Sequence, residues 1–255
     1  MEFVLICFVA FAASWLTLIS GFGLGTLLLP TFILFFSPLE AVAMTAIVHF
    51  LNNVFKFSLL FKQVNRYVAL WFGVSGIVGA AVGAWVSTNV EKSIAYTSPL
   101  DGVSEVSWFS FLVGILMIVF ALQELLLGKV GFAFSKKAMV PGGVLSGFFG
   151  GLTGHQGALR SMFLLKSGLT AQTYVATGTA IALMVDLTRI PIYLGRISKG
   201  GIDKHTLLIA SATLFAFIGA FIGKRMIEKI TYTTVQWVVG VLMIVVGLLL
   251  LLGLL

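Results

Sequence analysis

Charged residues are scarce in this sequence. Asp, Glu, Lys and Arg make up 10% of its 255 residues, whereas hydrophobic residues make up 59%. A soluble domain carries roughly 25% charged residues, and the mean hydropathy of this chain is +1.10. Too few polar groups remain to cover a surface that faces water. We therefore expect an integral membrane protein that is surrounded by the lipid bilayer.

Cysteine and the common catalytic patterns are scarce as well. The only cysteine, Cys7, cannot form a disulfide within the chain and says nothing about the redox compartment. The three histidines occur without the His-Glu-x-x-His spacing of zinc enzymes, and neither a Gly-x-Ser-x-Gly elbow nor a Walker-type loop is present. We therefore expect no metal, no cofactor and no enzymatic activity.

An excess of basic residues is present, with 16 Lys and Arg against 9 Asp and Glu. These residues do not gather on one exposed domain, as they would in a nucleic-acid-binding protein. Most of them lie in short connections between apolar runs, where the positive-inside bias of membrane proteins puts them. We therefore expect no nucleic-acid partner.

Eight apolar runs are long enough to cross a bilayer core of about 30 Å, which takes about 20 residues of helix. They are residues 3–36, 39–61, 67–88, 106–127, 138–165, 169–194, 205–226 and 232–255. The first and the fifth run are each interrupted by glycine. Since the start of the chain lacks a basic stretch typical of a signal peptide, we expect the first run to be retained.

The two sets of four runs resemble each other. Residues 113–119 match 239–245 almost residue for residue, and 79–83 match 219–223, in the same order. An internal duplication explains this order better than chance similarity between apolar helices. We predict an all-α integral membrane protein of about eight transmembrane segments in two repeats of four. The predicted parts are a first transmembrane repeat at 1–127, a basic connecting loop at 128–137 and a second transmembrane repeat at 138–255.

The basic residues of the connections predict an orientation when each interrupted run is treated as one crossing. One side receives eight of them: Lys62, Arg66, Lys129, Lys136, Lys137, Arg196, Lys199 and Lys204. The other side receives five: Lys92, Lys166, Lys224, Arg225 and Lys229. This predicts a multi-pass protein of the cytoplasmic membrane with both termini in the cytoplasm. If each interrupted run is instead a hairpin, the crossing count changes and the repeats are inverted rather than parallel.

The second run carries a polar face. His49, Asn52, Asn53 and Lys56 follow one another at i, i+3, i+4 and i+7, which places them on one side of a helix. Polar and ionisable groups at membrane depth are costly and usually functional. We predict that His49, Asn52 and Asn53 belong to a substrate site, while Lys56 belongs to a coupling or structural set with Asp186 and Arg189 or extends toward the membrane surface.

In the second half, Asp186 and Arg189 lie three residues apart and can form an ion pair. A constant offset of 130 residues places Thr179 opposite His49 and Asp186 opposite Lys56 in the other repeat. The pair is a candidate coupling site for transport, and the alternative is a purely structural salt bridge.

The glycine-rich stretch around residue 155 is the strongest functional signal. His155, Gln156 and Arg160 lie among Gly154 and Gly157 inside an apolar run. A helix broken at membrane depth is tolerated where its backbone is buried or lines a cavity. The start of its second half presents unpaired N–H groups and favours an anion.

A shorter copy of this stretch, with Gly21, Gly23 and Gly25, stands in the first half. Two such breaks facing each other would form a small anion site near the middle of the membrane. The alternative is that the glycines only permit close packing of helices.

At these residues the chain resembles the TauE/SafE family of membrane transporters, the sulfite exporters, over nearly its whole length. The resemblance rests on two copies of a glycine-rich broken helix, each followed by a Leu-x-Ala start of the next helix. The copies are Gly21, Gly23 and Gly25 with Leu39-Glu40-Ala41, and Gly150, Gly151, Gly154 and Gly157 with Leu169-Thr170-Ala171. The chain departs from the family pattern where His155-Gln156 replaces small residues and where Arg160 matches Pro30.

The resemblance implies a secondary transporter of a small anion, sulfur-containing like sulfite or a sulfonate. A proton carried by His49 is a candidate coupling ion, because histidine titrates near neutral pH. Movement is predicted as rocking of one half against the other. A passive anion channel, a transporter of a small carboxylate and a homo-oligomer remain open alternatives.

Overall fold

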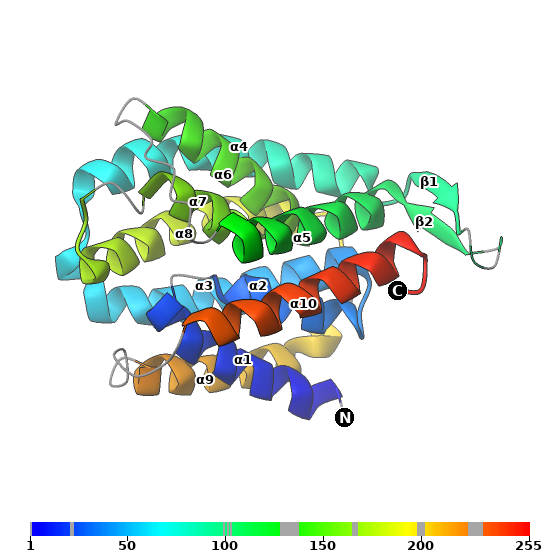
Figure 1. Ribbon diagram of the computed structural model, residues 1–255, viewed down its shortest axis with the longest axis horizontal. Coiled ribbons are helices and arrows are strands. Elements are labelled where there is room, and N and C mark those ends of the chain that lie inside the picture. Colours follow the sequence, from blue (N-terminus) through cyan, green and yellow to red (C-terminus); the bar gives the residue numbers. More distant parts are fainter. Residues whose placement is uncertain are drawn as a thin grey trace.

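The computed structural model describes residues 2–20, 23–98, 100, 102, 104–127, 138–164, 168–197, 202–223 and 232–255. Gly21 and the predicted loop at 128–137 lie outside the described residues. The helices of the first half are α1 (Glu2–Ser20), α2 (Leu24–Ile33), α3 (Pro38–Leu60), the short η1 (Phe61–Gln63), α4 (Arg66–Val90) and α5 (Trp108–Leu127). The helices of the second half are α6 (Met139–Thr153), α7 (Gln156–Leu164), α8 (Ala171–Leu194), the short η3 (Asp203–His205), α9 (Thr206–Gly223) and α10 (Tyr232–Leu251). They form an elongated bundle with roughly parallel axes (Figure 1).

The predicted membrane class agrees with the lengths of these helices. Four of the described helical segments are long and apolar enough to span a bilayer: Pro38–Gln63, Arg66–Val90, Ala171–Leu194 and Thr206–Gly223. Several shorter apolar helices accompany them. Exposed side chains on these helices are largely apolar, with Val78, Trp85 and Leu214 each about 60% exposed. Such a surface is stable against lipid and unstable against water.

Two of the long helices begin directly after a capping residue that is visible in the sequence. Asn65 precedes α4 and accepts a hydrogen bond from the Val68 N–H at 3.1 Å, and Thr170 caps α8 in the same way through the Thr173 N–H. Side-chain caps of this kind satisfy backbone donors that the first turn leaves unpaired. The Asn65 N–H also donates to Thr177 at 2.9 Å, so the first turns of α4 and α8 lie at the same end of the bundle.

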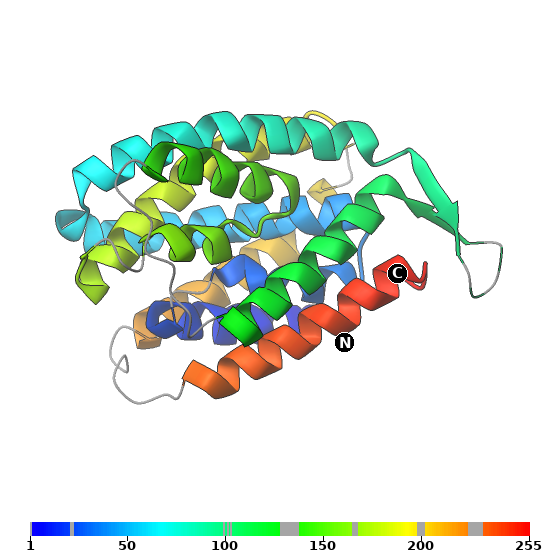
Figure 2. The ribbon, with the colours of Figure 1, turned by 45° about the horizontal axis from the view of Figure 1, so that its top comes forward.

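Each interrupted run is a helical hairpin, and its treatment as a single crossing was wrong. Gly154 ends α6 with a φ of 86°, a left-handed conformation that favours glycine. α7 then runs back along α6 (Figure 2), so that a Cβ atom at Gly142 would lie 2.5 Å from the ring of Phe163. In the first half, α2 follows the glycine break after α1 and packs on both α1 and α3, with Gly25 beside Thr45 of α3.

A short β-hairpin, which the all-α prediction did not include, joins α4 to α5. Strand β1 (Ile94–Thr97) pairs with β2 (Glu105–Ser107) in antiparallel fashion. The hairpin extends beyond the helix ends, close to the C-terminus (Figure 1). The Tyr96 hydroxyl donates to the Leu251 carbonyl, and Ser98 donates to the Leu252 carbonyl at 2.6 Å. The hairpin thereby satisfies carbonyl groups at the end of α10 that its own helix leaves unpaired.

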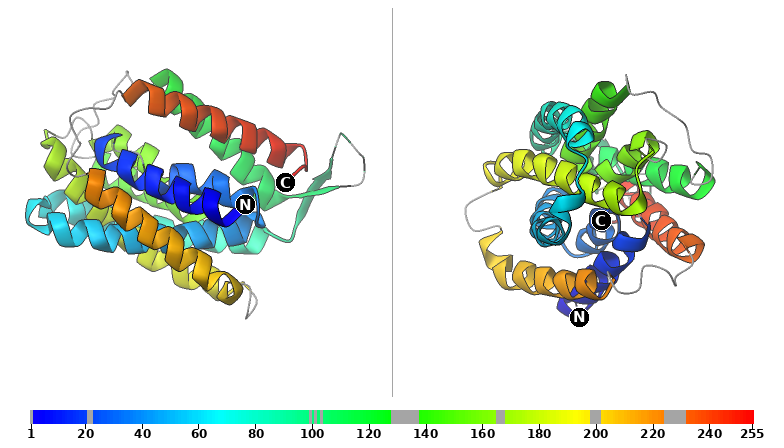
Figure 3. Two further views of the ribbon diagram at one scale, coloured as in Figure 1. Left: turned by 90° about the horizontal axis from the view of Figure 1, so that it is seen from below. Right: turned by 90° about the vertical axis from the view of Figure 1, so that its left-hand side faces the viewer.

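The helices pack in two groups, each of which combines both halves of the sequence. The first helix group contains α1, α2, α3 and α9, and the second helix group contains α4, α6, α7 and α8. Viewed along the bundle, α1 and α9 lie on one side while α4 and α6 lie on the other (Figure 3). The groups meet where α3 packs on α8, and α5 packs on α10 beside them.

Glycines bring the helices of each group into backbone contact. A Cβ atom at Gly79 of α4 would lie 2.0 Å from the Val144 carbonyl oxygen of α6. At the corresponding place in the other group, a Cβ atom at Gly219 of α9 would lie 2.2 Å from the Phe11 carbonyl oxygen of α1. Even a methyl group is excluded at both positions. Close contacts through small residues of this kind hold helices together in lipid, which agrees with the packing role considered for glycine above.

Because the interrupted runs are hairpins, the connection between α8 and α9 lies at the end of the bundle opposite to the one predicted from the sequence. Arg196 donates to Asn89, at the end of α4, over 3.2 Å. His205 contacts the ring of Phe36, just before α3. The grouping of Arg196 with Arg66 was therefore wrong, since Arg66 stands at the opposite end of α4.

Candidate functional site

A small cavity lies between the two helix groups, where α2 and α3 face α7 and α8. Its volume is about 40 Å³. A water molecule requires roughly 10–15 Å³ by this measure, so the cavity has room for a few waters or one small ion. It is lined by Gly23, Leu24, His49, Asn53, Lys56, Arg160, Tyr174, Val175, Gly178, Thr179 and Ala182.

The lining carries positive charge. Lys56 and Arg160 are 5% and 8% exposed, and no Asp or Glu is among the lining residues. Two atoms of Arg160, Nε and Nη1, are buried without a hydrogen-bond partner among the described residues. A buried cation with unpaired donors is expensive in a membrane. An anion in the cavity would compensate this cost.

The first turn of α2 adds to this positive field. Gly23 stands at the N-cap of α2 in an extended conformation, and Leu24 is the first residue of the helix. Both residues line the cavity. The N-terminus of a helix carries unpaired N–H groups and a partial positive charge, which attract anions. The first glycine break therefore contributes a helix start to the cavity.

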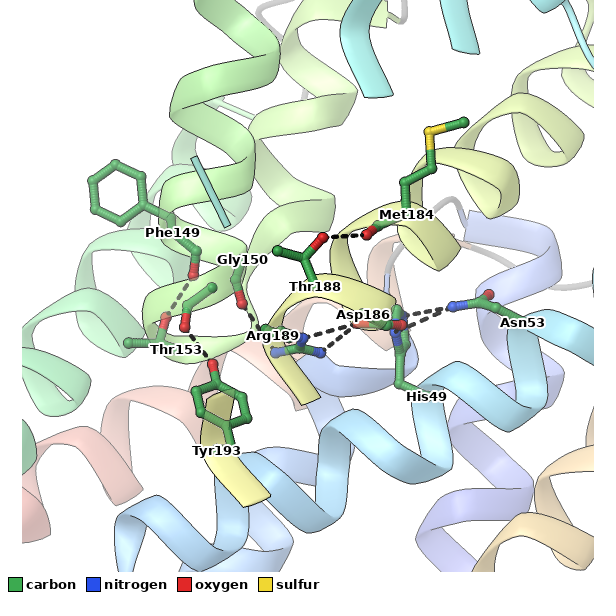
Figure 4. A network of polar contacts seen from close by, with 11 residues as sticks. His49, Asn53, Phe149, Gly150, Thr153, Met184, Asp186, Thr188, Arg189 and Tyr193 are labelled. Carbon is green, nitrogen blue, oxygen red and sulfur yellow. Dashed lines mark hydrogen bonds and ion pairs between the residues drawn. The ribbon is translucent and has the colours of Figure 1, made fainter. Parts of the chain in front are cut away.

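His49 connects the cavity to a buried carboxylate (Figure 4). Its Nδ1 lies 2.6 Å from Oδ2 of Asp186, and the amide nitrogen of Asn53 lies 3.2 Å from its other ring nitrogen, Nε2. Nε2 is also directed toward Gly23, where a Cβ atom would lie 4.0 Å away. Because the carboxylate accepts a hydrogen bond from Nδ1–H, Nε2 accepts from the Asn53 amide at the edge of the cavity.

Asp186 also binds Arg189, as the sequence predicted. Arg189 reaches Oδ1 of Asp186 with both Nε and Nη2 at 2.8 Å, and its Nη1 donates to the Gly150 carbonyl at 2.9 Å. Tyr193 donates its hydroxyl to the Gly151 carbonyl. These bonds join α8 to the end of α6, so a continuous set of polar contacts runs from His49 to the break between α6 and α7 (Figure 4).

The predicted site residues divide into two sets. Four of the ten predicted substrate-binding residues line the cavity, namely Gly23, His49, Asn53 and Arg160, and Lys56 joins them. The remaining six are not among the lining residues: Gly25, Asn52, Gly154, His155, Gln156 and Gly157. The structure thus brings one residue of the second glycine stretch into the cavity and leaves its histidine outside.

His155 lies on another face of the α6–α7 hairpin. Its ring stacks on Phe120 of α5, with 5.5 Å between the centroids. The Thr153 hydroxyl donates to the Phe149 carbonyl and lies 3.0 Å from His155 Nδ1. Since that hydroxyl hydrogen is used, Nδ1 is the donor of the second bond. The buried Nε2 is then an acceptor that has no partner within the described part of the chain.

Asn52 and Gln156 are also not among the residues that line the cavity. Asn52 accepts a hydrogen bond from Ser14 of α1 at 3.0 Å, so it joins α1 to α3 within the first helix group. The Gln156 carbonyl accepts a hydrogen bond from Ser146 at 3.0 Å, which holds the start of α7 against α6. Both residues therefore hold helices of one group together.

Several lining residues on α8 escaped the sequence analysis. Tyr174, Val175, Gly178, Thr179 and Ala182 line the cavity at spacings of one, three or four residues. This helical spacing was visible in the sequence, but these residues are uncharged and look like ordinary membrane-helix residues. Thr179 alone had a signal, since it matches His49 at the repeat offset.

A comparison with protein families identifies the chain over most of its length. A family model described as "Sulfite exporter TauE/SafE" matches residues 6–250. Searches of curated proteins and of solved structures find no match.

Proposed function

Because the chain belongs to the sulfite exporter TauE/SafE family, a family of membrane transporters, we propose that it is a secondary transporter of a small sulfur oxyanion such as sulfite. The anion would occupy the cavity between α3 and α8. The single observation that carries this proposal is the buried Arg160, which lines a cavity without carboxylates and whose Nε and Nη1 have no partner among the described residues.

Charge and size together favour a compact oxyanion. Arg160 and Lys56 supply two basic side chains, and Nε2 of His49 when protonated and the N–H groups at the start of α2 supply further donors. A volume of about 40 Å³ suits an ion with a few heavy atoms. Sulfonates with an organic tail would need a larger space in the state that the structure describes.

His49 is the proposed site of proton coupling. Its Nδ1 is held by Asp186 at 2.6 Å and its Nε2 is directed toward Gly23 at the cavity. Protonation of Nε2 would add positive charge beside the anion, so anion and proton would favour each other in the site. Asp186 and Arg189 are then a coupling and positioning pair rather than direct ligands of the anion.

The moving parts that we propose are the two helix groups, not the two sequence halves. α4 of the first half is locked to α6 of the second half by backbone contact, and α1 is locked to α9. Rocking of intact halves, as expected from the sequence, would break both contacts. Movement of one group against the other leaves both of these contacts intact and changes the α3–α8 interface, which contains the cavity.

The arrangement also supports two inverted repeats, each with five helices including the short one of its hairpin. Under this proposal α1 corresponds to α6 and α4 corresponds to α9. The contacts of Gly79 with Val144 and of Gly219 with Phe11 are then the same contact in both repeats. Inverted repeats with a site at their interface are common in secondary transporters.

The same arrangement favours an orientation opposite to the one expected from the sequence. α9 runs parallel to α3, since Phe36 contacts His205 and Phe55 stacks on Phe217. One end of the bundle then has nine basic residues in its connections: Lys62, Arg66, Lys129, Lys136, Lys137, Lys166, Lys224, Arg225 and Lys229. The other end has four: Lys92, Arg196, Lys199 and Lys204. We place the first end in the cytoplasm of a cytoplasmic-membrane protein, with both termini outside.

Cysteine labelling tests the orientation. Replacing Cys7, the only cysteine, gives a cysteine-free background. Single cysteines at the exposed Lys62 and Lys204 positions are then treated in intact cells with a membrane-impermeant maleimide. We expect labelling at position 204 and protection at position 62. The reverse pattern would restore the cytoplasmic termini.

Anion binding and flux test the function. Purified protein is heated with sulfite, sulfate, thiosulfate, sulfoacetate, taurine or short carboxylates. A ligand at 100 times its Kd adds about 2.7 kcal/mol to the free energy of unfolding. We expect stabilisation by sulfite and its loss in Arg160→Ala. Stabilisation by a carboxylate alone would change the substrate class. In proteoliposomes, a transporter shows saturating flux and counterflow of labelled anion driven by unlabelled anion, whereas a channel shows non-saturating flux and little counterflow.

A further inference from the structure

Gly178 of α8 lies directly against the guanidinium group of Arg160. A Cβ atom at Gly178 would lie 3.2 Å from Nε of Arg160, 3.4 Å from Cζ and 3.4 Å from Nη2. Both residues line the cavity. The contact joins α7 to α8 at the place where the site presents its unpaired donors.

The three nearly equal distances define the orientation of the guanidinium group. A point that lies at 3.2 to 3.4 Å from three atoms of a planar group stands over its face. The face of the guanidinium group therefore rests on the backbone of α8, and its N–H bonds run parallel to that surface. Its Nε and Nη1 are buried and have no partner among the described residues.

We propose that Gly178 is a positioning residue for the anion site. Its missing side chain gives Arg160 a flat surface and thereby fixes the direction of the donors. This inference depends on the proposed binding of an anion by Arg160, but the contact itself can be tested without any ligand.

Gly178→Ala adds one methyl group directly against the guanidinium group of Arg160. Contacts of 3.0 to 3.4 Å are tighter than most Cβ atoms tolerate, so the guanidinium group would shift by a few tenths of an ångström. Hydrogen bonds weaken steeply when their angles deteriorate. The substitution should therefore weaken anion binding even though alanine favours a helix more than glycine does.

A double-mutant cycle on thermal stability tests the contact without ligand. Gly178→Ala in the Arg160→Ala background should raise the Tm, because the helix gains alanine and the methyl group meets no guanidinium. The same change in the wild-type background should lower the Tm or leave it unchanged. Equal effects in both backgrounds would overturn the proposal.

Titration with sulfite tests the consequence for binding. We expect at least about tenfold weaker binding in Gly178→Ala, the size of one lost hydrogen bond to a charged group. The matched control is Gly195→Ala at the C-cap of α8, where a Cβ atom meets only carbonyl groups of the helix that it ends, the nearest being Pro191 at 3.4 Å. It should bind sulfite like the wild type.

The outcomes separate this inference from the proposed function. Absence of sulfite binding in the wild type contradicts sulfite as the substrate, and the stability cycle still decides on the contact. Wild-type affinity in Gly178→Ala, together with lost binding in Arg160→Ala, contradicts the positioning role alone.

Discussion

The α4–α6 interface is built from glycine, whereas the α3–α8 interface is built from ionisable side chains. At the first interface, backbone contacts backbone. For example, a Cβ atom at Gly147 of α6 would lie only 2.1 Å from the Gly76 carbonyl oxygen of α4. At the second, His49 reaches Asp186 across the interface and a cavity remains between the helices.

The two interfaces have different roles: the glycine interface gives rigidity, and the polar interface can carry function. A backbone contact of this kind cannot slide, because each glycine fits against one carbonyl of the partner helix, and the packing gives stability. A polar interface costs desolvation but can hold an ion and can exchange partners. We therefore expect substitutions at α4–α6 to affect the amount of folded protein, and those at the cavity to affect transport. Four predictions follow this comparison, in order of their expected effect on stability.

Removing the shared carboxylate should have the largest effect. Asp186→Asn leaves Arg189 as a buried, uncompensated cation and should lower the free energy of unfolding by about 3–5 kcal/mol, measured by denaturation in detergent. The double variant with Arg189→Gln removes both charges and should recover part of that loss. A single variant as stable as the wild type would show that the pair contributes little.

Adding a methyl group at the contact between α4 and α6 should have the second largest effect on stability. Gly79→Ala places a methyl group 2.0 Å from the Val144 carbonyl oxygen, and overpacking should cost about 1–3 kcal/mol. Gly76→Ala is the control on the same helix, because its Cβ atom would lie 3.4 Å from the Gly143 carbonyl oxygen. Thermal unfolding should separate the two variants. Equal Tm values would argue against a rigid backbone contact.

Removing the cation of the cavity should change transport more than stability. Arg160→Ala should abolish sulfite flux in proteoliposomes, because the anion loses its charged donor. The unfolding free energy should stay within about 1 kcal/mol of the wild type, since two donors of Arg160 are buried without partners among the described residues and are costly to keep. Arg66→Ala, at an exposed site, is the control with normal flux. Unchanged flux in Arg160→Ala would remove Arg160 from the site.

The smallest effect is expected at His155. His155→Phe keeps the ring beside Phe120 and removes the hydrogen bond to Thr153, worth about 1 kcal/mol. Because His155 does not line the cavity, sulfite affinity should be retained, whereas His49→Phe should abolish coupled transport. Loss of sulfite binding in His155→Phe would return His155 to the site.

Much of the candidate site was predictable where the signal was local. Asp186 and Arg189 lie one helical turn apart, so their ion pair follows from spacing alone. His49 and Asn53 share a helix face for the same reason. The contact between His49 and Asp186 was not predicted, because it joins residues 137 positions apart and depends on how α3 packs on α8.

The glycine stretch around residue 155 shows where sequence reasoning fails. Composition correctly marked a break at Gly154, whose left-handed conformation favours glycine. It did not indicate that the chain reverses there, since reversal depends on the packing of α7 against α6. As a consequence Arg160 reaches the cavity, while His155 faces Phe120.

The sequence by itself determined the membrane class, the family and the positions of the helices, because hydrophobicity, spacing and caps act within a few residues. The tertiary structure alone decided that the interrupted runs are hairpins, that helices of both halves combine in each group, and which polar side chains share a cavity. These features depend on contacts between distant residues, such as glycine against a backbone carbonyl. The pattern of apolar residues along a helix does not specify which partner its glycines will meet.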